Sequence, residues 1–169
     1  EAAAAIRNRL GNPEATIHFL SGGTQTNLVV ISSLLRTHEA VISAASGHIA
    51  THETGAIEAT GHKVITCDSP DGKLSPDMIL RTVDEYETLK PHVVKPRMVY
   101  ISNATEMGTI YSRAELEGLF AVCRSRGLYL FMDGARLAHA LAAGGNDLTL
   151  EEIARLTDVF YIGGTKNGA

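Results

Sequence analysis

The chain has 169 residues, which is enough for one domain with its own core. Charged residues make up 20% of the chain, and a net charge of −4 without a basic stripe argues against nucleic acid as a partner. No apolar run approaches the roughly 18 to 20 residues that span a bilayer, which argues against a membrane partner. The two cysteines, Cys67 and Cys123, lie in apolar stretches and form no disulfide framework, which predicts a reducing, cytoplasmic setting.

Short apolar runs alternate with longer amphipathic segments along the chain. The short runs predict five strands, at residues 41–45, 63–67, 98–102, 129–132 and 159–162, and the segments between them predict crossover helices. The alanine-rich start is typical of a helix, and the proline-bounded segment 91–96 predicts a loop. The pattern therefore predicts an α/β fold with a mostly parallel sheet.

Three helices carry clear start signals. Ser112 and Thr149 each stand three residues before a glutamate, the spacing of a capping box, and each precedes an apolar-periodic segment. Ser75 is followed by a proline and an aspartate, a cap with a favoured first turn. These signals predict helices that begin next to residues 75, 112 and 149.

Residues 21–27, Ser-Gly-Gly-Thr-Gln-Thr-Asn, precede an apolar-rich helix that ends near Arg36. The glycines and Thr24 offer free backbone amides, a hydroxyl and the positive end of a helix dipole, a combination that suits a phosphate. An ordinary helix cap explains the same residues equally well. The glycine spacing matches neither a P-loop nor a dinucleotide fingerprint.

His48 follows the first predicted strand, where its ring can stack on a flat cofactor. Without that context a surface or hydrogen-bonded histidine is the better interpretation. His48 and His52 also have the i, i+4 spacing of a helical metal pair, with Glu53 adjacent. The sequence places no third ligand, so a zinc site is the weaker hypothesis.

Asp133 ends the apolar run 128–132 and begins the segment Asp-Gly-Ala-Arg. A carboxylate at the end of such a run needs a partner, and a protonated pyridine nitrogen is one. An ion pair with Arg136 or a helix cap is the alternative. Arg136 has the planar fork that binds a carboxylate with two hydrogen bonds, so an anionic substrate group is a second candidate for it.

Lys166 follows Ile-Gly-Gly-Thr after the last apolar run, which predicts a buried strand directly before it. A lysine amine held partly neutral in a semi-apolar pocket can form a Schiff base with an aldehyde such as pyridoxal phosphate. A solvated surface lysine is the alternative. Because Asp133 and Lys166 both follow predicted parallel strands, we expect them to meet at one edge of the sheet.

Together these motifs resemble the threonine aldolases, which belong to the β-eliminating-lyase group of fold-type I pyridoxal-phosphate enzymes. The segments 21–27, His48, Met-Asp-Gly-Ala-Arg and Gly-Gly-Thr-Lys occur in order over essentially the whole chain. The resemblance implies that residues 1–169 form the single large, cofactor-binding domain of the aspartate-aminotransferase-like architecture. We expect the chain to be truncated at both ends and to lack a C-terminal small domain.

The resemblance also assigns roles in a cofactor site. It implies that Lys166 forms the Schiff base with pyridoxal 5'-phosphate, that Asp133 pairs with the ring nitrogen, and that His48 stacks on the ring. The implied phosphate site and its surroundings comprise Gly23, Thr24, Thr165 and Arg136.

For the substrate, the resemblance implies that Arg136 contacts the carboxylate of an amino acid. The segment 103–106 departs from the family: many threonine aldolases carry a histidine near the substrate hydroxyl where this chain has Glu106. Glu106, His48 and a water are the candidates for the base that takes the hydroxyl proton.

The implied reaction is the retro-aldol cleavage of threonine or allo-threonine to glycine and an aldehyde. Another pyridoxal-phosphate reaction of the same fold, such as β-elimination or transamination, is the first alternative. The second is a catalytically incomplete fragment or a non-catalytic interaction module. The resemblance further implies a homodimer or homotetramer for the full-length protein.

Overall fold

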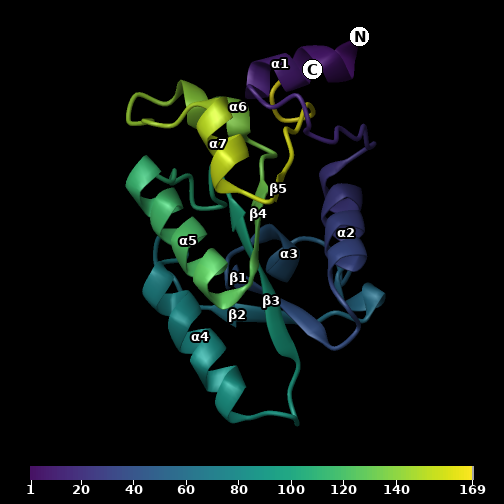
Figure 1. Ribbon diagram of the computed structural model, residues 1–169, viewed down its shortest axis with the longest axis vertical. Coiled ribbons are helices and arrows are strands. Elements are labelled where there is room, and N and C mark those ends of the chain that lie inside the picture. The colour runs from purple at the N-terminus through teal and green to yellow at the C-terminus, as the bar shows by residue number, and fades with distance from the viewer. Residues whose placement is uncertain (169) are drawn as a thin grey trace.

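Five parallel strands form the centre of the computed structural model, which describes residues 1–168 (Figure 1). The order of the strands across the sheet is β2-β1-β3-β4-β5. Their bounds are β1 (Glu39–Ala44), β2 (Val64–Cys67), β3 (Lys95–Ser102), β4 (Tyr129–Asp133) and β5 (Val159–Phe160). All four neighbouring pairs are parallel, which confirms the α/β fold expected from the alternating pattern.

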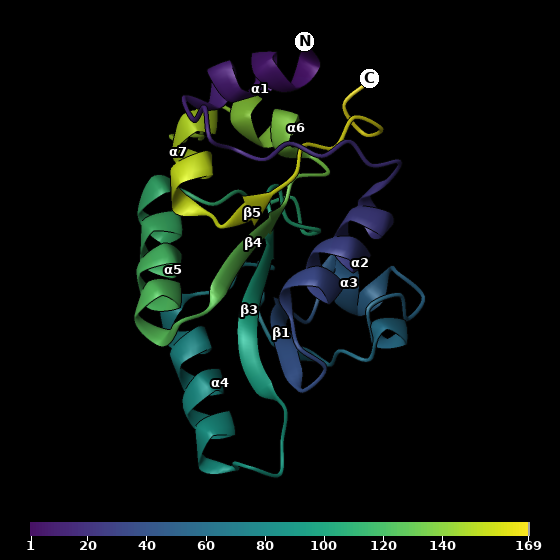
Figure 2. The same ribbon diagram turned by 45° about the vertical axis from the view of Figure 1, so that its right-hand side comes forward.

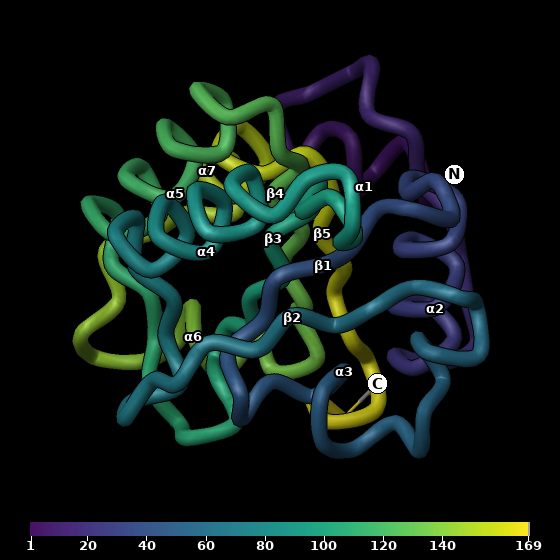
Figure 3. The backbone as a smooth tube through the Cα atoms, turned by 90° about the horizontal axis from the view of Figure 1, so that it is seen from below, coloured from purple at the N-terminus to yellow at the C-terminus, as the bar shows by residue number. Residues whose placement is uncertain are grey.

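Helices connect the strands. They are α1 (Ala2–Leu10), α2 (Gly23–Leu34), α3 (His48–Thr51), a 3-10 turn η1 (Glu58–Thr60), α4 (Pro76–Thr88), α5 (Arg113–Arg126), α6 (Leu137–Ala142) and α7 (Leu150–Leu156). In Figure 2, α4, α5 and α7 lie on one side of the sheet and α2 and α3 on the other. Seen from below, the strands lie between these two groups of helices (Figure 3).

Alternation of side chains along each strand builds a separate core on each face of the sheet. One core joins Ile42, Val99 and Leu130 to the apolar faces of α4, α5 and α7. The other joins Val41 and Phe131 to α2, α3 and the segment around η1. Both faces of the central strands are therefore covered, which explains why every residue of β1 is buried.

The predicted helix starts are confirmed. Capping boxes open α5 at Ser112 and α7 at Thr149, with the side chain and backbone contacts of the motif both present. The Ser75 hydroxyl accepts a hydrogen bond from the backbone of Met78 at the start of α4. Each bond satisfies a backbone N–H that the helix itself leaves unpaired.

Two predicted boundaries are wrong. Residues 159–162 do not form a buried strand: β5 holds only Val159 and Phe160, both half-buried, and Ile162 is 49% exposed. β5 lies at the edge of the sheet and pairs only with β4, so it lacks the second neighbour that buries a central strand. The loop predicted at 91–96 also ends early, because β3 begins at Lys95. Pro96 pairs there with Ala40 beside an irregularity in β1, a position where a strand tolerates proline.

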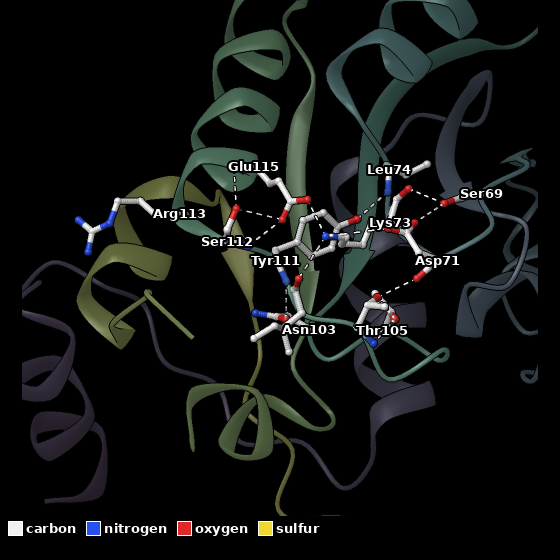
Figure 4. A network of polar contacts seen from close by, with 12 residues as sticks. Ser69, Asp71, Lys73, Leu74, Asn103, Thr105, Tyr111, Ser112, Arg113 and Glu115 are labelled. Carbon is white, nitrogen blue, oxygen red and sulfur yellow. Dashed lines mark hydrogen bonds and ion pairs between the residues drawn. The ribbon is translucent and has the colours of Figure 1, made fainter. Parts of the chain in front are cut away.

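A polar network clamps the loop after β2 onto the start of α5 (Figure 4). The Lys73 ammonium lies 2.5 Å from the Glu115 carboxylate, and the Tyr111 hydroxyl accepts a bond of 2.7 Å from the backbone of Leu74. Burial raises the pKa of Tyr111, so its hydroxyl stays protonated. The network fixes two loops on the carboxyl side of the sheet, the side on which ligands bind in this class of fold.

Candidate active site

Four separated segments meet at the carboxyl ends of the strands around a pocket of about 200 Å³. The segments are the start of α2, the start of α3, the end of β4 and the loop after β5. The residues that line the pocket are Gly23, Thr24, His48, Asp133, Ala135, Tyr161, Gly163, Thr165 and Lys166. The structure thus brings together six of the eight site residues predicted from the sequence, while Arg136 and Glu106 are not among the lining residues.

Asp133 ends β4 as a nearly buried carboxylate with 3% exposure. Its Oδ2 accepts hydrogen bonds from the Tyr100 hydroxyl at 2.5 Å and the Asn27 amide at 3.2 Å. Its Oδ1 accepts from the Tyr161 hydroxyl at 2.5 Å and the backbone N–H of Ala135 at 2.9 Å. All four donors are neutral, and within residues 1–168 no lysine or arginine forms an ion pair with this carboxylate. A salt bridge to Arg136, one alternative considered for Asp133, is therefore not formed.

The two tyrosines that contact Asp133 are locked as hydrogen-bond donors. Burial is the main cause that raises the pKa of Tyr100 well above its usual value, and the charge of Asp133 adds to it. The same two causes, in the same order, raise the pKa of Tyr161. Both hydroxyls therefore keep their protons at neutral pH, and both donate to the carboxylate.

His48 begins α3 and forms part of the pocket wall. Its Nδ1 lies 2.8 Å from Oε1 of Glu53, a residue with 4% exposure. The same Oε1 accepts a 2.7 Å hydrogen bond from the amide of Asn27. His48 is thus a hydrogen-bonded histidine with one ring edge on a buried carboxylate, and it still lines the pocket.

The zinc hypothesis for this segment gains no support. The rings of His48 and His52 stack on each other with centroids 5.5 Å apart. Nδ1 of His52 lies 2.5 Å from the Thr51 hydroxyl, so it is engaged locally. In the part of the chain that the structure describes, no three His, Cys, Asp or Glu side chains are grouped to hold a metal ion.

No helix of residues 1–168 is long and apolar enough to cross a membrane.

The helix after the glycine pair begins earlier than the apolar residues indicate, at Gly23, so that Gly23 and Thr24 form the first turn of α2. The backbone N–H groups of a first turn have no partner inside the helix, and the helix dipole is positive there. A Cβ on Gly23 would lie 2.9 Å from the Tyr161 hydroxyl. The absence of a side chain at Gly23 therefore keeps this end of the pocket open.

Lys166 lies in a turn that packs against the loop after β4. The backbone N–H of Gly163 donates to the Gly134 carbonyl at 2.9 Å, and a Cβ on Gly163 would lie 2.8 Å from Cα of Ala135. This close approach brings Thr165 and Lys166 to the pocket that contains Asp133. Both side chains are exposed, however, so the semi-apolar enclosure expected for Lys166 is absent from residues 1–168.

Arg136 and Glu106 contact each other. The guanidinium of Arg136 donates two hydrogen bonds of 3.0 Å, one to each carboxylate oxygen of Glu106. These bonds are the main cause that raises the pKa of Arg136. Two residues predicted to contact substrate separately are therefore joined in a half-buried ion pair.

The side chains and backbone amides around the pocket suit the functional groups of pyridoxal phosphate. A buried carboxylate with neutral donors alone is short of positive charge, and a protonated pyridine nitrogen supplies that charge. The free amides at the start of α2 suit the phosphate. The amine of Lys166 is the group that can bond the aldehyde, and the His48 ring provides a flat wall.

Three buried residues of the site escaped the sequence reasoning: Asn27, Glu53 and Tyr100. Asn27 lies one helical turn after Gly23, so the i, i+4 spacing places both on one face of α2. Glu53 stands next to the i, i+4 pair His48 and His52, where the sequence indicates only a possible metal ligand. Tyr100 points to the same face as the pocket by strand alternation, but its contact with Asp133 spans 33 residues of sequence.

This architecture, with its ligand pocket at the carboxyl ends of parallel strands, is that of the large domain of the fold-type I pyridoxal-phosphate enzymes. An archaeal alanine:glyoxylate aminotransferase shares the fold with a TM-score of 0.67 at 18% identity. The match covers 86% of this chain and 35% of that one.

The chain belongs to the beta-eliminating lyase family, whose family model matches residues 1–169. A low specificity L-threonine aldolase of Pseudomonas sp. (strain NCIMB 10558) is 37% identical over 163 residues, which cover 95% of this chain and 46% of the relative. The solved threonine aldolase of Leishmania major is 58% identical with a TM-score of 0.96, covering 99% of this chain and 48% of that one. The chain spans about half the length of the curated relatives it matches. Pyridoxal phosphate is the cofactor of this family.

Proposed function

We propose that the full protein cleaves a β-hydroxy-α-amino acid, threonine or allo-threonine, to glycine and an aldehyde, with residues 1–169 as its cofactor-binding large domain. The observation that carries the proposal is the meeting of Lys166, Asp133, His48 and the start of α2 around one pocket. The names of the similar proteins, L-threonine aldolases of bacteria and a threonine aldolase of Leishmania major, give the substrate class.

In this proposal each pocket residue has a distinct task. Lys166 holds the cofactor through its amine, and Asp133 keeps a proton on the ring nitrogen. Gly23, Thr24 and Thr165 hold the phosphate, and the His48 ring packs on the cofactor ring. When bound, pyridoxal phosphate takes up the electron pair that the broken Cα–Cβ bond releases.

Arg136 and Glu106 divide the substrate contacts between them. Arg136 binds the substrate carboxylate with its planar fork, and for this the Glu106 carboxylate must leave the guanidinium. Glu106, once released, is then a free carboxylate beside the substrate. Glu106 and His48 are the two side chains that we propose as the base for the β-hydroxyl proton. Loss of that proton leaves the aldehyde.

The direct test uses the complete protein loaded with pyridoxal phosphate. Incubation with threonine should yield acetaldehyde and glycine in equal amounts. A keto acid as the product would assign β-elimination or transamination to the same site instead. Lys166→Ala should abolish the absorbance band at about 410 to 430 nm that a lysine-bound cofactor gives. If the wild type lacks that band, the chain is a non-catalytic module.

We also propose that the full protein is a homodimer or homotetramer of the cytoplasm. Phe19, Leu20 and Val29 are large apolar side chains with exposures of 68%, 43% and 40%, and they lie next to the pocket segment at the start of α2. Exposed apolar side chains of this size support a protein–protein contact. Both cysteines are free thiols, which supports a reducing compartment. Light scattering of the complete protein measures the oligomeric state.

A further inference from the structure

A series of hydrogen bonds between polar side chains connects His48 to Asp133. Nδ1 of His48 contacts Oε1 of Glu53 at 2.8 Å, and Oε1 also accepts from the Asn27 amide at 2.7 Å. The same Asn27 amide donates to Oδ2 of Asp133 at 3.2 Å. These contacts link α2, α3 and β4, which provide three of the four segments around the pocket.

The contacts determine which atoms carry hydrogen. Asn27 is fully buried and lies between two carboxylates, so its NH₂ group, the only part of the amide that donates, must face both of them. Oε1 of Glu53 is therefore an acceptor. Because Oε1 is the acceptor of this contact, the His48 ring donates to it from Nδ1.

This assignment leaves Nε2 as the ring nitrogen of His48 that Glu53 does not engage. The ring is in the pocket wall, and 23% of the side chain is exposed. Glu53 thus sets both the orientation of the ring and its tautomer. Without it the ring could turn and offer either nitrogen to the pocket.

The two carboxylates also share a shortage of positive charge. Within residues 1–168, neither Glu53 nor Asp133 forms an ion pair with a lysine or an arginine, and His48 contacts Glu53 through Nδ1. The Asn27 NH₂ group holds the two anions in fixed positions and shields each from the other. Oδ2 of Asp133 is thereby committed to Asn27 and Tyr100, and the pocket-side contact with Tyr161 falls to Oδ1.

We propose that Glu53 and Asn27 are positioning residues for the cofactor site: they hold His48 in its Nδ1–H tautomer, with Nε2 left for the pocket, and fix Asp133 through Oδ2. The inference rests on the proposed function only in that the pocket takes pyridoxal phosphate. The tautomer itself is a property of the cofactor-free protein.

The test records the two ring nitrogens of His48 by ¹⁵N NMR in the complete, cofactor-free protein, in mildly alkaline buffer. His48→Asn assigns the signal. We expect the wild type to carry its hydrogen on Nδ1. Glutamine can keep its carbonyl oxygen at the place of Oε1, so the variant that removes the acceptor is Glu53→Leu. Without an acceptor at Nδ1 the hydrogen is no longer held there, and the Nε2–H form should become populated. Glu58→Leu makes the same change at an exposed residue of η1 and should leave the signal unchanged.

Cofactor affinity is the second readout. Glu53→Leu should weaken binding of pyridoxal phosphate on the order of tenfold by equilibrium dialysis, the lower end of the loss seen when the hydrogen-bond partner of a metal-binding histidine is removed. A wild-type His48 with its hydrogen on Nε2 overturns the inference, whether or not any variant folds. An unchanged tautomer and affinity in a folded Glu53→Leu protein overturn it as well. A tautomer that shifts as expected in a protein that binds no cofactor supports the inference and rejects the proposed function.

Discussion

The guanidinium of Arg136 donates one hydrogen bond of 3.0 Å to each carboxylate oxygen of Glu106, the two-bond geometry in which arginine binds a substrate carboxylate. The pair therefore places a protein carboxylate on the residue expected to bind the substrate. The hydrogen bonds raise the pKa of Arg136, which stays charged. An entering amino acid would replace the Glu106 carboxylate on the guanidinium by its own, so Arg136 would remain paired with one carboxylate.

The first prediction concerns Glu106→Gln. A neutral amide competes less well for the guanidinium, so the substrate carboxylate should bind more easily and KM for threonine should fall about three- to tenfold. This range is modest because the pair is half-buried and screened by water. Steady-state kinetics of the complete enzyme measure it. Glu85→Gln, an exposed substitution on α4, is the control. An unchanged KM would show that Glu106 does not compete with substrate.

The second prediction concerns Asp133→Asn. The amide keeps the shape of the side chain but removes the negative charge that, in the proposed function, holds a proton on the ring nitrogen. We expect kcat to fall about 10²- to 10³-fold, as when other preorganised charges of an active site are removed. Asp84→Asn removes an exposed carboxylate from α4 and should leave kcat unchanged. Activity near the wild-type level in Asp133→Asn would remove Asp133 from the mechanism.

The features that the sequence predicts correctly are local. A capping box such as that at Ser112 is written in four consecutive residues, and a central strand such as β4 appears as a continuous apolar run. The rule that ligands lie at the carboxyl ends of parallel strands then places His48, Asp133 and Lys166 together. Local patterns and one topological rule suffice for the outline of the pocket.

The features that the sequence does not predict depend on pairing between distant residues. Asn27 contacts Asp133 across 106 positions, and Arg136 contacts Glu106 across 30. No periodicity specifies such contacts. The apolar run before Lys166 gives the wrong burial for a related reason: apolar residues at a sheet edge look the same in sequence as those of a central strand. Burial depends on neighbours that the pattern does not reveal.

The third prediction concerns Tyr161→Phe. The substitution keeps the ring and removes the hydroxyl that donates to Oδ1 of Asp133 at 2.5 Å. Because the buried carboxylate then loses one of its donors, the substitution should lower the free energy of unfolding of the cofactor-free protein by about 1 to 3 kcal/mol. Urea unfolding measures it. Tyr86→Phe is the control, because the Tyr86 hydroxyl forms no hydrogen bond among residues 1–168. Equal stability of the two variants would mean that the contact contributes nothing.

The fourth prediction follows from the clamp around Glu115. Burial by itself raises the pKa of this carboxyl, but the hydrogen bonds from Lys73 and Ser112 outweigh it, so that the pKa lies below the usual 4.5. A carboxyl with a lowered pKa in the folded state stabilises the protein fully above its unfolded pKa. That contribution is lost as the pH falls through the folded pKa. Glu115→Gln isolates the charge, because glutamine also completes a capping box.

We therefore expect Glu115→Gln to lower the free energy of unfolding at neutral pH by about 0.5 to 1 kcal/mol, a value limited by the exposure of the carboxylate. The difference from the wild type should shrink as the pH falls from 4.5 through the lower pKa of the folded state, where the wild-type carboxylate becomes protonated too. Urea unfolding at a series of pH values measures it. Glu117→Gln, an exposed change on the same helix, should show no such trend. A difference that stays constant with pH would mean that the clamp acts through packing and neutral hydrogen bonds. The link between the loop after β2 and α5 would then not depend on the charge of Glu115.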